Sequence, residues 1–182
     1  MLVVAEREQL PVAQARAGAP DAWDTLFRRY QLPLYVYVFQ LVGDEQSSLD
    51  IVQDTFINAA RHLGTLRDDD RFGSWLFGIA HQKCVQRWRK RAHEETPVEE
   101  MSDFATRDPG PDEILIRQEQ ETEFMAALSR LPELQREVLL LHYLEEFPVE
   151  QIAEVTQAAV GTVKSRLHYA RKALRKLMEN CL

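Results

Sequence analysis

An apolar stripe near the carboxyl end of this 182-residue chain constrains its fold more than any other feature. The stripe consists of Val160, Val163, Leu167, Ala170, Leu174 and Leu177. Intervals of three and four residues place apolar side chains on one face of an α-helix, whereas a strand needs intervals of two. The stripe therefore predicts an amphipathic helix over about 159–178.

The rest of the chain has the composition of a helical protein. Apolar residues make up 45% of it, which is enough to form a core, and the 8 prolines and 7 glycines are spread out. Helix-forming residues dominate, and no alternating run is long enough to predict a strand. The sequence therefore predicts an all-α fold.

Helical periodicity is present in two bodies, residues 21–91 and 113–182. In the first body we expect helices over 21–41, with Asp21 as N-cap and a kink or break at Pro33, over 48–63 and over 74–91. Leu49 and Phe56 lie on the inward stripe of the second of these helices, and Ile79 and Val85 on that of the third. In the second body we expect helices over 113–129, 132–144, 148–155 and 159–178.

The segment between the two bodies has a different composition. Periodicity disappears over 92–112, and residues 92–123 hold eleven acids against two arginines. This pattern predicts an acidic, flexible linker over 92–112. Residues 1–20 form a short, weakly patterned lead.

Basic residues are concentrated in two runs, although the net charge of the chain is −7. Residues 83–91 hold five basic residues and residues 164–176 hold six, with no acid in either run. Two such runs suggest two surfaces for a polyanion, which would repel the acidic linker. Two solvated helix faces beside an acidic loop would explain the charges equally well.

Several classes of function find no support in the sequence. It has no nucleotide-binding loop, no nucleophile paired with a base and no cluster of metal ligands, so we expect no catalytic residue, no metal, no cofactor and no small-molecule substrate. The two cysteines, Cys84 and Cys181, fit no disulfide framework. We find no membrane-spanning stretch and no signal peptide, and we expect a cytoplasmic protein.

The short helix before the apolar stripe completes a helix-turn-helix pattern over about 148–177. Val149, Ile152 and Ala153 form its inward face, and a tight turn separates it from the basic helix. Such a pair can hold the second helix in the major groove of DNA, with its first side chains at the base edges. A surface helix or a partner-binding helix is the alternative.

These residues carry a family resemblance. Leu131–Leu141, Ile152–Glu154 and Val160–Leu167 resemble region 4 of bacterial sigma-70 factors, and are most similar to the small extracytoplasmic-function (ECF) group. Ala22–Tyr30, Asp50–Phe56 and Phe72–Ala80 resemble region 2 of the same group. The resemblance implies a region 2 helical bundle over 21–91, the acidic linker, and a region 4 helix-turn-helix over 113–182.

The resemblance also implies a role for particular residues. It assigns Asp50, Gln53, Asp54 and Phe56 to core RNA polymerase; acids beside an apolar anchor suit a basic coiled coil. It assigns Phe72, Trp75, Gln82, Lys83, Arg87, Trp88, Arg89, Lys90 and Arg91 to melting of the minus-ten element, with the loop 67–72 as the site of an extruded base. It assigns Thr162, Lys164, Ser165, Arg166, His168, Tyr169, Arg171 and Lys172 to the minus-35 element.

The implied function is that of a sigma factor, a promoter-recognition subunit without catalytic activity. Its implied partners are promoter DNA and the beta-prime clamp helices and beta flap of RNA polymerase core; family members are often also held inactive by an anti-sigma factor. Two alternatives are a polymerase-independent helix-turn-helix regulator and a decoy that mimics a sigma factor. The chain departs from the family pattern at two positions. Gln82 stands where Asn is common, and Gln157 stands where Gly is common. A glutamine in the left-handed conformation of this turn costs about 1 kcal/mol relative to glycine.

Overall fold

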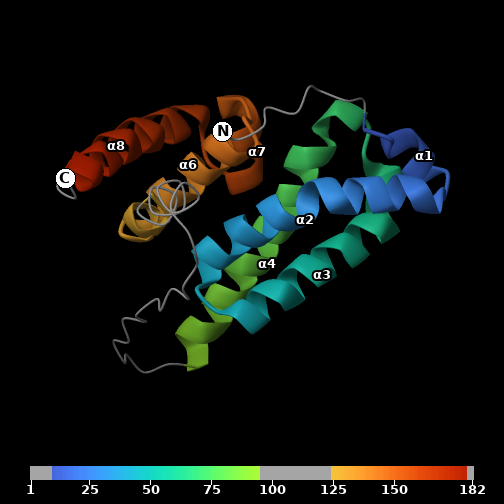
Figure 1. Ribbon diagram of the computed structural model, residues 1–182, viewed down its shortest axis with the longest axis horizontal. Coiled ribbons are helices and arrows are strands. Elements are labelled where there is room, and N and C mark those ends of the chain that lie inside the picture. Colours follow the sequence, from blue (N-terminus) through green and yellow to red (C-terminus); the bar gives the residue numbers. More distant parts are fainter. Residues whose placement is uncertain (1–9, 95–123, 180–182) are drawn as a thin grey trace, which may run out of the picture. The chain divides into compact units, whose positions relative to one another are not determined.

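The computed structural model describes residues 10–94 and 124–179, with side chains described as far as Lys90 in the first range. Every regular element in these two ranges is a helix (Figure 1). The chain divides into two compact units, the first built on residues up to Arg89 and the second on most of the residues that follow. The predicted all-α fold with two helical domains is confirmed, while the expected linker lies largely outside the described residues.

The first unit is a bundle in which α2 and α3 run side by side and α4 crosses them at an angle (Figure 1). Its elements are α1 (Val12–Arg16), α2 (Pro20–Val42), α3 (Glu45–His62), two 3₁₀ turns (Leu63–Thr65 and Asp69–Arg71) and α4 (Phe72–Glu94). The short α1 lies in the segment for which the sequence predicted only a weakly patterned lead.

Helix α2 runs through Pro33 without a break, so of the predicted kink or break the break does not occur. Pro33 removes one backbone hydrogen bond, and an interior proline costs about 3 kcal/mol. Leu34 and Tyr37 are fully buried just beyond it, and burial of each such side chain contributes roughly 1.5–3 kcal/mol. Tertiary packing therefore keeps the helix continuous. It begins at Pro20, so Asp21 lies in the first turn instead of capping it.

The junction between α2 and α3 is set by two residues with opposite functions. Gly43 ends α2 in the left-handed conformation, with φ 73°, which glycine adopts without strain. Asp44 then caps α3, because its carboxylate accepts a hydrogen bond from the Ser47 N–H at 2.9 Å. The helix consequently begins three residues before the predicted start at Ser48.

The inward face of α3 differs from the predicted stripe. Ile51, Thr55 and Ala59 are buried, whereas Leu49 is 47% exposed. Leu49 directly follows the fully buried Ser48, and consecutive residues of a helix do not share a face, so Leu49 lies beside the buried stripe. The acids and the apolar side chains around Leu49 therefore share a solvent-facing surface.

Helix α4 supplies the third side of this core. Its fully buried side chains are Phe72, Leu76, Phe77, Ala80 and Cys84. Phe72 packs against Tyr30 of α2 with ring centroids 5.5 Å apart. The helix extends beyond the predicted range 74–91 at both ends, and Ile79 and Val85, predicted to face inward, are only half-buried.

The second unit contains a helical segment over 124–129, α6 (Glu133–Leu144), α7 (Val149–Thr156) and α8 (Val160–Glu179). The remainder of the helix predicted over 113–129 lies outside the described residues. Helix α8 packs on α6 through Val163, Leu167, Ala170 and Leu174, which are buried as the stripe predicted. The stripe loosens at both ends, since Val160 is 36% exposed and Leu177 is half-buried.

None of the helices in the described ranges is long and apolar enough to cross a lipid bilayer.

Candidate nucleic-acid and partner interfaces

Helices α7 and α8 are joined by a turn whose conformation is fixed by a backbone φ angle and a backbone hydrogen bond. Gln157 has a left-handed conformation with φ 52°, and the Ala158 N–H donates to the Ala153 carbonyl at 3.1 Å. A side chain other than glycine is strained in this conformation. Buried Ile152 and Val155 fix α7 on the other side of the turn. The arrangement is a helix-turn-helix in which α8 is the second helix.

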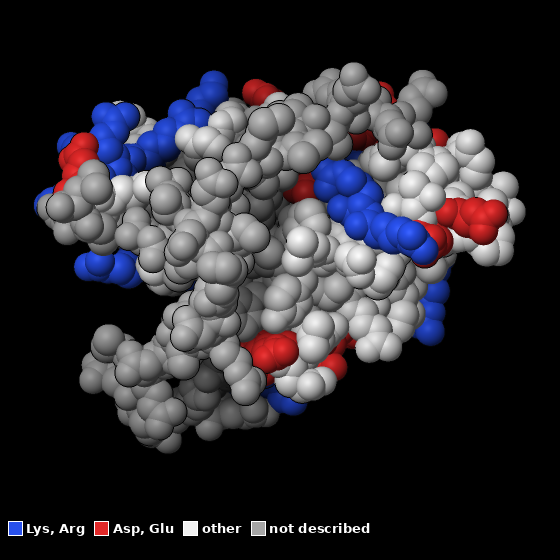
Figure 2. Space-filling view, in the orientation of Figure 1, with Lys and Arg blue, Asp and Glu red and all other residues white. Residues whose placement is uncertain are grey.

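The outer face of α8 carries the residues predicted to bind DNA. Thr162, Lys164, Ser165, His168, Tyr169, Arg171 and Lys172 are exposed, and Arg166 is half-buried beside the apolar stripe. Figure 2 shows the Lys and Arg side chains gathered over this helix. A basic helix face with an anchored opposite face suits a polyanionic groove.

Contacts with α6 orient one basic side chain of this face. The Arg171 guanidinium donates to Nε2 of His142 at 2.8 Å and lies 5.9 Å from the ring centroid of Tyr143. Because arginine only donates, His142 accepts through Nε2 and carries its proton on Nδ1. The Ser165 hydroxyl donates to the Thr162 carbonyl at 3.0 Å. Lys164 and Arg166 lie on the part of the face nearest the helix start.

The face predicted to bind polymerase lies on α3. Asp50, Gln53 and Asp54 are exposed there, in line with Leu49 and Ile57, which are 47% and 40% exposed. These five residues recur at helical intervals and form one acidic and apolar surface, which we call the α3 face. A partner-binding surface of this kind combines charge selection with an apolar anchor.

Phe56 does not belong to the α3 face. It is only 9% exposed and packs under Phe27 of α2 with ring centroids 4.8 Å apart. In this conformation Phe56 supports the α3 face from the core, and its predicted direct contact with polymerase stays a prediction. The sequence predicted Leu49 to face inward and did not single out Ile57; their exposure follows from which face of α3 the bundle buries.

The basic residues of α4 make several contacts within the first unit. Lys83 donates to the Asp54 carboxylate at 3.1 Å, so the predicted DNA surface and the α3 face meet at this pair. Arg87 lies 3.9 Å from the carboxylate of Asp44. The Trp88 indole donates to the Leu41 carbonyl at 3.3 Å, which fixes its ring against α2.

The remaining residues predicted for the minus-ten element differ in exposure. Gln82, Arg89 and Lys90 are exposed, whereas the side chain of Arg91 lies outside the described residues. Phe72 is fully buried and offers no surface to DNA in this conformation; it lies beneath Trp75 with ring centroids 6.0 Å apart. Trp75 is half-buried and presents the rest of its indole to solvent.

The described residues contain no group of histidines, cysteines and acids that could hold a metal ion. Cys84 is buried and does not form a disulfide.

Comparison with protein families gives two matches in the expected order. The family described as Sigma-70 region 2 matches residues 26–94, and Sigma-70, region 4 matches residues 121–174. These ranges include α3, α4 and the helix-turn-helix, which carry the candidate surfaces.

Relatives and solved structures agree with these matches. The chain is 32% identical over 190 residues to the RNA polymerase sigma-H factor of Pseudomonas aeruginosa, covering 100% of this chain and 98% of the relative. It is 26% identical over 178 residues to the ECF RNA polymerase sigma factor SigW of Bacillus subtilis, covering 93% and 95%.

A solved structure, the sigma factor RpoE in complex with the anti-sigma factor NepR from Bartonella quintana, is 25% identical with TM-score 0.65, covering 85% of this chain and 96% of that chain. The structure of CnrH in complex with the cytosolic domain of CnrY has TM-score 0.66 at 24% identity, covering 96% and 99%, and supports the fold. A polymerase-independent regulator would not account for the region 2 match. The alignments with the sigma-H factor and SigW cover nearly the whole length of both proteins in each pair. The chain therefore belongs to the sigma-70 family, as an ECF RNA polymerase sigma factor that directs promoter-specific transcription initiation.

Proposed function

We propose that three surfaces of this sigma factor divide the work of initiation. The α3 face binds polymerase core, α4 with the loop before it holds the melted minus-ten element, and the outer face of α8 recognises the minus-35 element. The observation that carries this proposal is that the three sets of side chains lie on separate, rigidly packed helices. The sets touch where Lys83 of α4 pairs with Asp54 of the α3 face, so this pair must open if both residues are to meet their partners.

The α3 face suits the beta-prime clamp helices of polymerase, which form the basic coiled coil expected from the family. Asp50, Gln53 and Asp54 supply acceptors for basic side chains, and Leu49 and Ile57 supply exposed apolar area. Complementary charge speeds association and fixes the register, while the apolar groups contribute to affinity. Phe56 supports this face from below.

The melted minus-ten strand requires both stacking groups and cations. Trp75 offers a partly exposed indole, and Gln82, Arg89 and Lys90 are exposed along the same helix. Arg91 continues the basic run in the sequence. Bases stack on aromatic rings while basic side chains follow the phosphates, so these residues suit single-stranded DNA. Buried Phe72 holds Trp75 in place, whereas Lys83, Arg87 and Trp88 need release from their contacts to act directly.

The minus-35 element is assigned to Lys164 and Arg166 above the other residues of α8. Both lie in the first two turns of the second helix of the helix-turn-helix, which is the part that reaches base edges in a major groove. Thr162, Ser165, His168, Tyr169, Arg171 and Lys172 complete the face. Lysine and arginine are suited to guanine edges and to phosphates alike.

A pair of matched double variants tests this division. Lys164→Ala with Arg166→Ala should abolish binding to the minus-35 element by the reconstituted holoenzyme, while association with core polymerase stays unchanged. Arg175→Ala with Lys176→Ala removes the same charge from the exposed end of the same helix and should retain promoter binding. Loss of core association together with promoter binding in the first variant would contradict the division.

We also infer the remaining partners and the setting of this protein. Region 4 would contact the beta flap of polymerase, and an anti-sigma factor would cover the α3 face, since the RpoE relative is solved in complex with one. Sigma factors are non-enzymatic regulators, so we expect no metal, no cofactor, no small-molecule substrate and no reaction catalysed by this chain. Its work with polymerase on promoter DNA implies a cytoplasmic protein.

A further inference from the structure

The loop between α3 and α4, residues 63–71, has few apolar contacts to fix its shape. Leu63 is buried and Leu66 is half-buried, but most of the other side chains of the loop are exposed. Two 3₁₀ turns, Leu63–Thr65 and Asp69–Arg71, make up most of its length. Its conformation therefore depends on polar contacts more than on burial.

Each turn is closed by its own hydrogen bonds. In the first, the Leu66 N–H donates to the Leu63 carbonyl at 3.1 Å. In the second, the Asp70 N–H donates to the Asp68 carboxylate at 3.1 Å. Each of these bonds lies within a single turn. The position of the two turns relative to each other therefore depends on further contacts.

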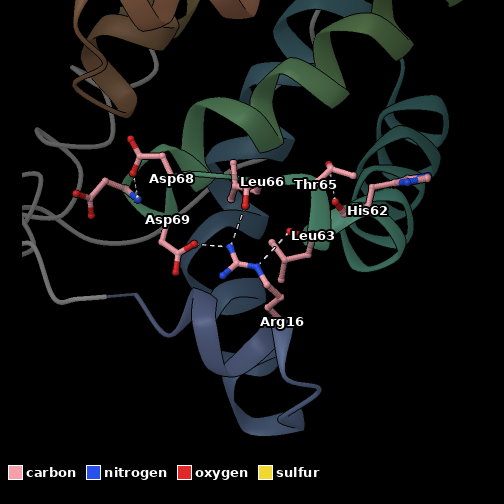
Figure 3. A network of polar contacts seen from close by, with 8 residues as sticks. Arg16, His62, Leu63, Thr65, Leu66, Asp68 and Asp69 are labelled. Atoms are coloured by element: carbon pink, nitrogen blue, oxygen red, sulfur yellow. Dashed lines mark hydrogen bonds and ion pairs between the residues drawn. The ribbon is translucent and has the colours of Figure 1, made fainter.

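The guanidinium of Arg16 in α1 bridges the two turns (Figure 3). Its Nε donates to the Leu63 carbonyl at 3.4 Å, and a terminal nitrogen donates to the Leu66 carbonyl at 3.2 Å. The same nitrogen forms an ion pair with the carboxylate of Asp69 in the second turn. One planar fork thus contacts three points of the loop, which a lysine ammonium cannot reproduce.

Helix α1 is itself firmly attached to the bundle. Val12 is fully buried and Ala15 is 3% exposed. The Trp23 indole of α2 donates to the Ala15 carbonyl at 3.1 Å, and Gly18 reverses the chain between the two helices with φ 88°. Arg16 is therefore presented to the loop from a fixed support.

We propose that Arg16 is a positioning residue for promoter opening, which it promotes by holding the loop 63–71 so that its second half, which lies within the predicted base site 67–72, keeps the conformation that receives the extruded minus-ten base. This inference rests on the proposed role of the loop. Extrusion costs unstacking free energy, which a pocket returns only when its groups are already in place. Without Arg16 the two turns lose the contact that joins them. Binding of the base must then also order the loop, and this costs conformational entropy.

The test compares two promoter templates that are already melted across the minus-ten element, bound by full-length protein in holoenzyme. One template has all its bases. The other lacks one base, and a series of such templates places this abasic site at each position of the minus-ten element in turn, so that the extruded position is identified. For the native protein we expect about tenfold tighter binding of the intact template at that position, a typical value for one stacked base. Arg16→Ala should reduce this ratio to about two, because a loop that is not held in place gains little from the base.

Two further variants separate positioning from stability. Arg28→Ala removes an exposed arginine that pairs with Asp24 at 2.8 Å, away from the loop, and should keep the native ratio. Arg16→Lys retains the charge but not the fork, so it should keep α1 in place and still lower the ratio. It serves as the primary variant if Arg16→Ala melts early or fails to bind core.

The outcomes distinguish this inference from the function on which it rests. Equal weakening of both templates by the Arg16 variants, with the ratio unchanged, would show a merely structural residue and overturn the inference. An intact-to-abasic ratio near one for the native protein at every position would overturn the role of the loop itself, and the inference with it. A reduced ratio with native melting temperature and core affinity would support both.

Discussion

Asp54 and Lys83 bring together two surfaces that serve different partners. Their charged groups are 3.1 Å apart, and the Asp54 side chain is 64% exposed while that of Lys83 is 21% exposed. An ion pair this open to solvent contributes between about 0 and 1 kcal/mol, because water and salt screen it. Asp54 therefore contributes little to the stability of the fold, and its placement is better explained by a partner that binds the α3 face.

Replacing Asp54 by Ala separates these two explanations. We expect the free energy of unfolding in urea to change by less than about 0.5 kcal/mol, and the affinity for core polymerase to fall about tenfold or more. Asp24→Ala is the matched control, since Asp24 is also an exposed acid paired with a basic residue, Arg28. The control should leave core affinity unchanged. A large loss of stability with native core affinity would instead make the Asp54 pair structural.

Gln157 determines how well the turn between α7 and α8 is formed. It adopts φ 52°, in the region where a side chain costs about 1 kcal/mol or more, whereas Gly43 adopts a similar conformation at the end of α2. The orientation of α8 depends on this turn. A weak turn would make the placement of the recognition helix sensitive to bound partners.

Exchanging the residue types at these two positions measures the strain. Gln157→Gly should raise the free energy of unfolding by up to about 1 kcal/mol, since it relieves the left-handed conformation. Gly43→Gln should lower it by a similar amount, because it introduces the same conflict where none exists. Thermal unfolding followed by circular dichroism measures both. A Gln157→Gly protein that is less stable than the native one would mean that the glutamine side chain makes a contact worth more than the strain.

The helices differed in how far they could be predicted from the sequence. Helix α8 was predicted to within a residue, because its stripe is long and has one period. The start of helix α3 was predicted three residues too late, since its cap Asp44 was assigned to the end of the preceding unit. Leu49 was placed inside for a different reason: it lies at the edge of the apolar stripe, and only the fold shows that this edge faces solvent. Helix α1 was missed because five residues are too few for a periodic pattern; it is stabilised by tertiary contacts such as the bond from Trp23 to Ala15.

Burial of individual aromatic residues was the least predictable property of the site. Phe72 and Phe56 have the residue type of a DNA or partner contact, and the family resemblance placed them in the right segments. Whether such a ring faces outward depends on what covers it, here Tyr30 for Phe72 and Phe27 for Phe56. These partners come from another helix, and only the fold brings them together.

For the protein as a whole, the distribution of charge affects DNA binding more than the net charge does. The chain has 29 acids against 22 basic residues, but residues 164–176 carry six basic residues and no acid. Residues 92–123 carry eleven acids. DNA bound by the basic surfaces is a dense polyanion, so the acids of this segment oppose binding wherever they lie within a Debye length, about 10 Å at 0.1 M salt.

Neutralising part of this segment should therefore strengthen promoter binding. Exchanging Glu95, Glu99 and Glu100 for Gln and Asp103 for Asn should tighten holoenzyme binding several-fold at about 0.05 M salt, and the gain should disappear near 1 M, where the Debye length is about 3 Å. Thr96→Ala with Ser102→Ala alters the same segment without changing its charge and should bind like the native protein. Filter binding over a salt series measures both. A gain that persisted at high salt would show that the substitutions act through a direct contact, because screening removes only the long-range repulsion between the acids and the promoter.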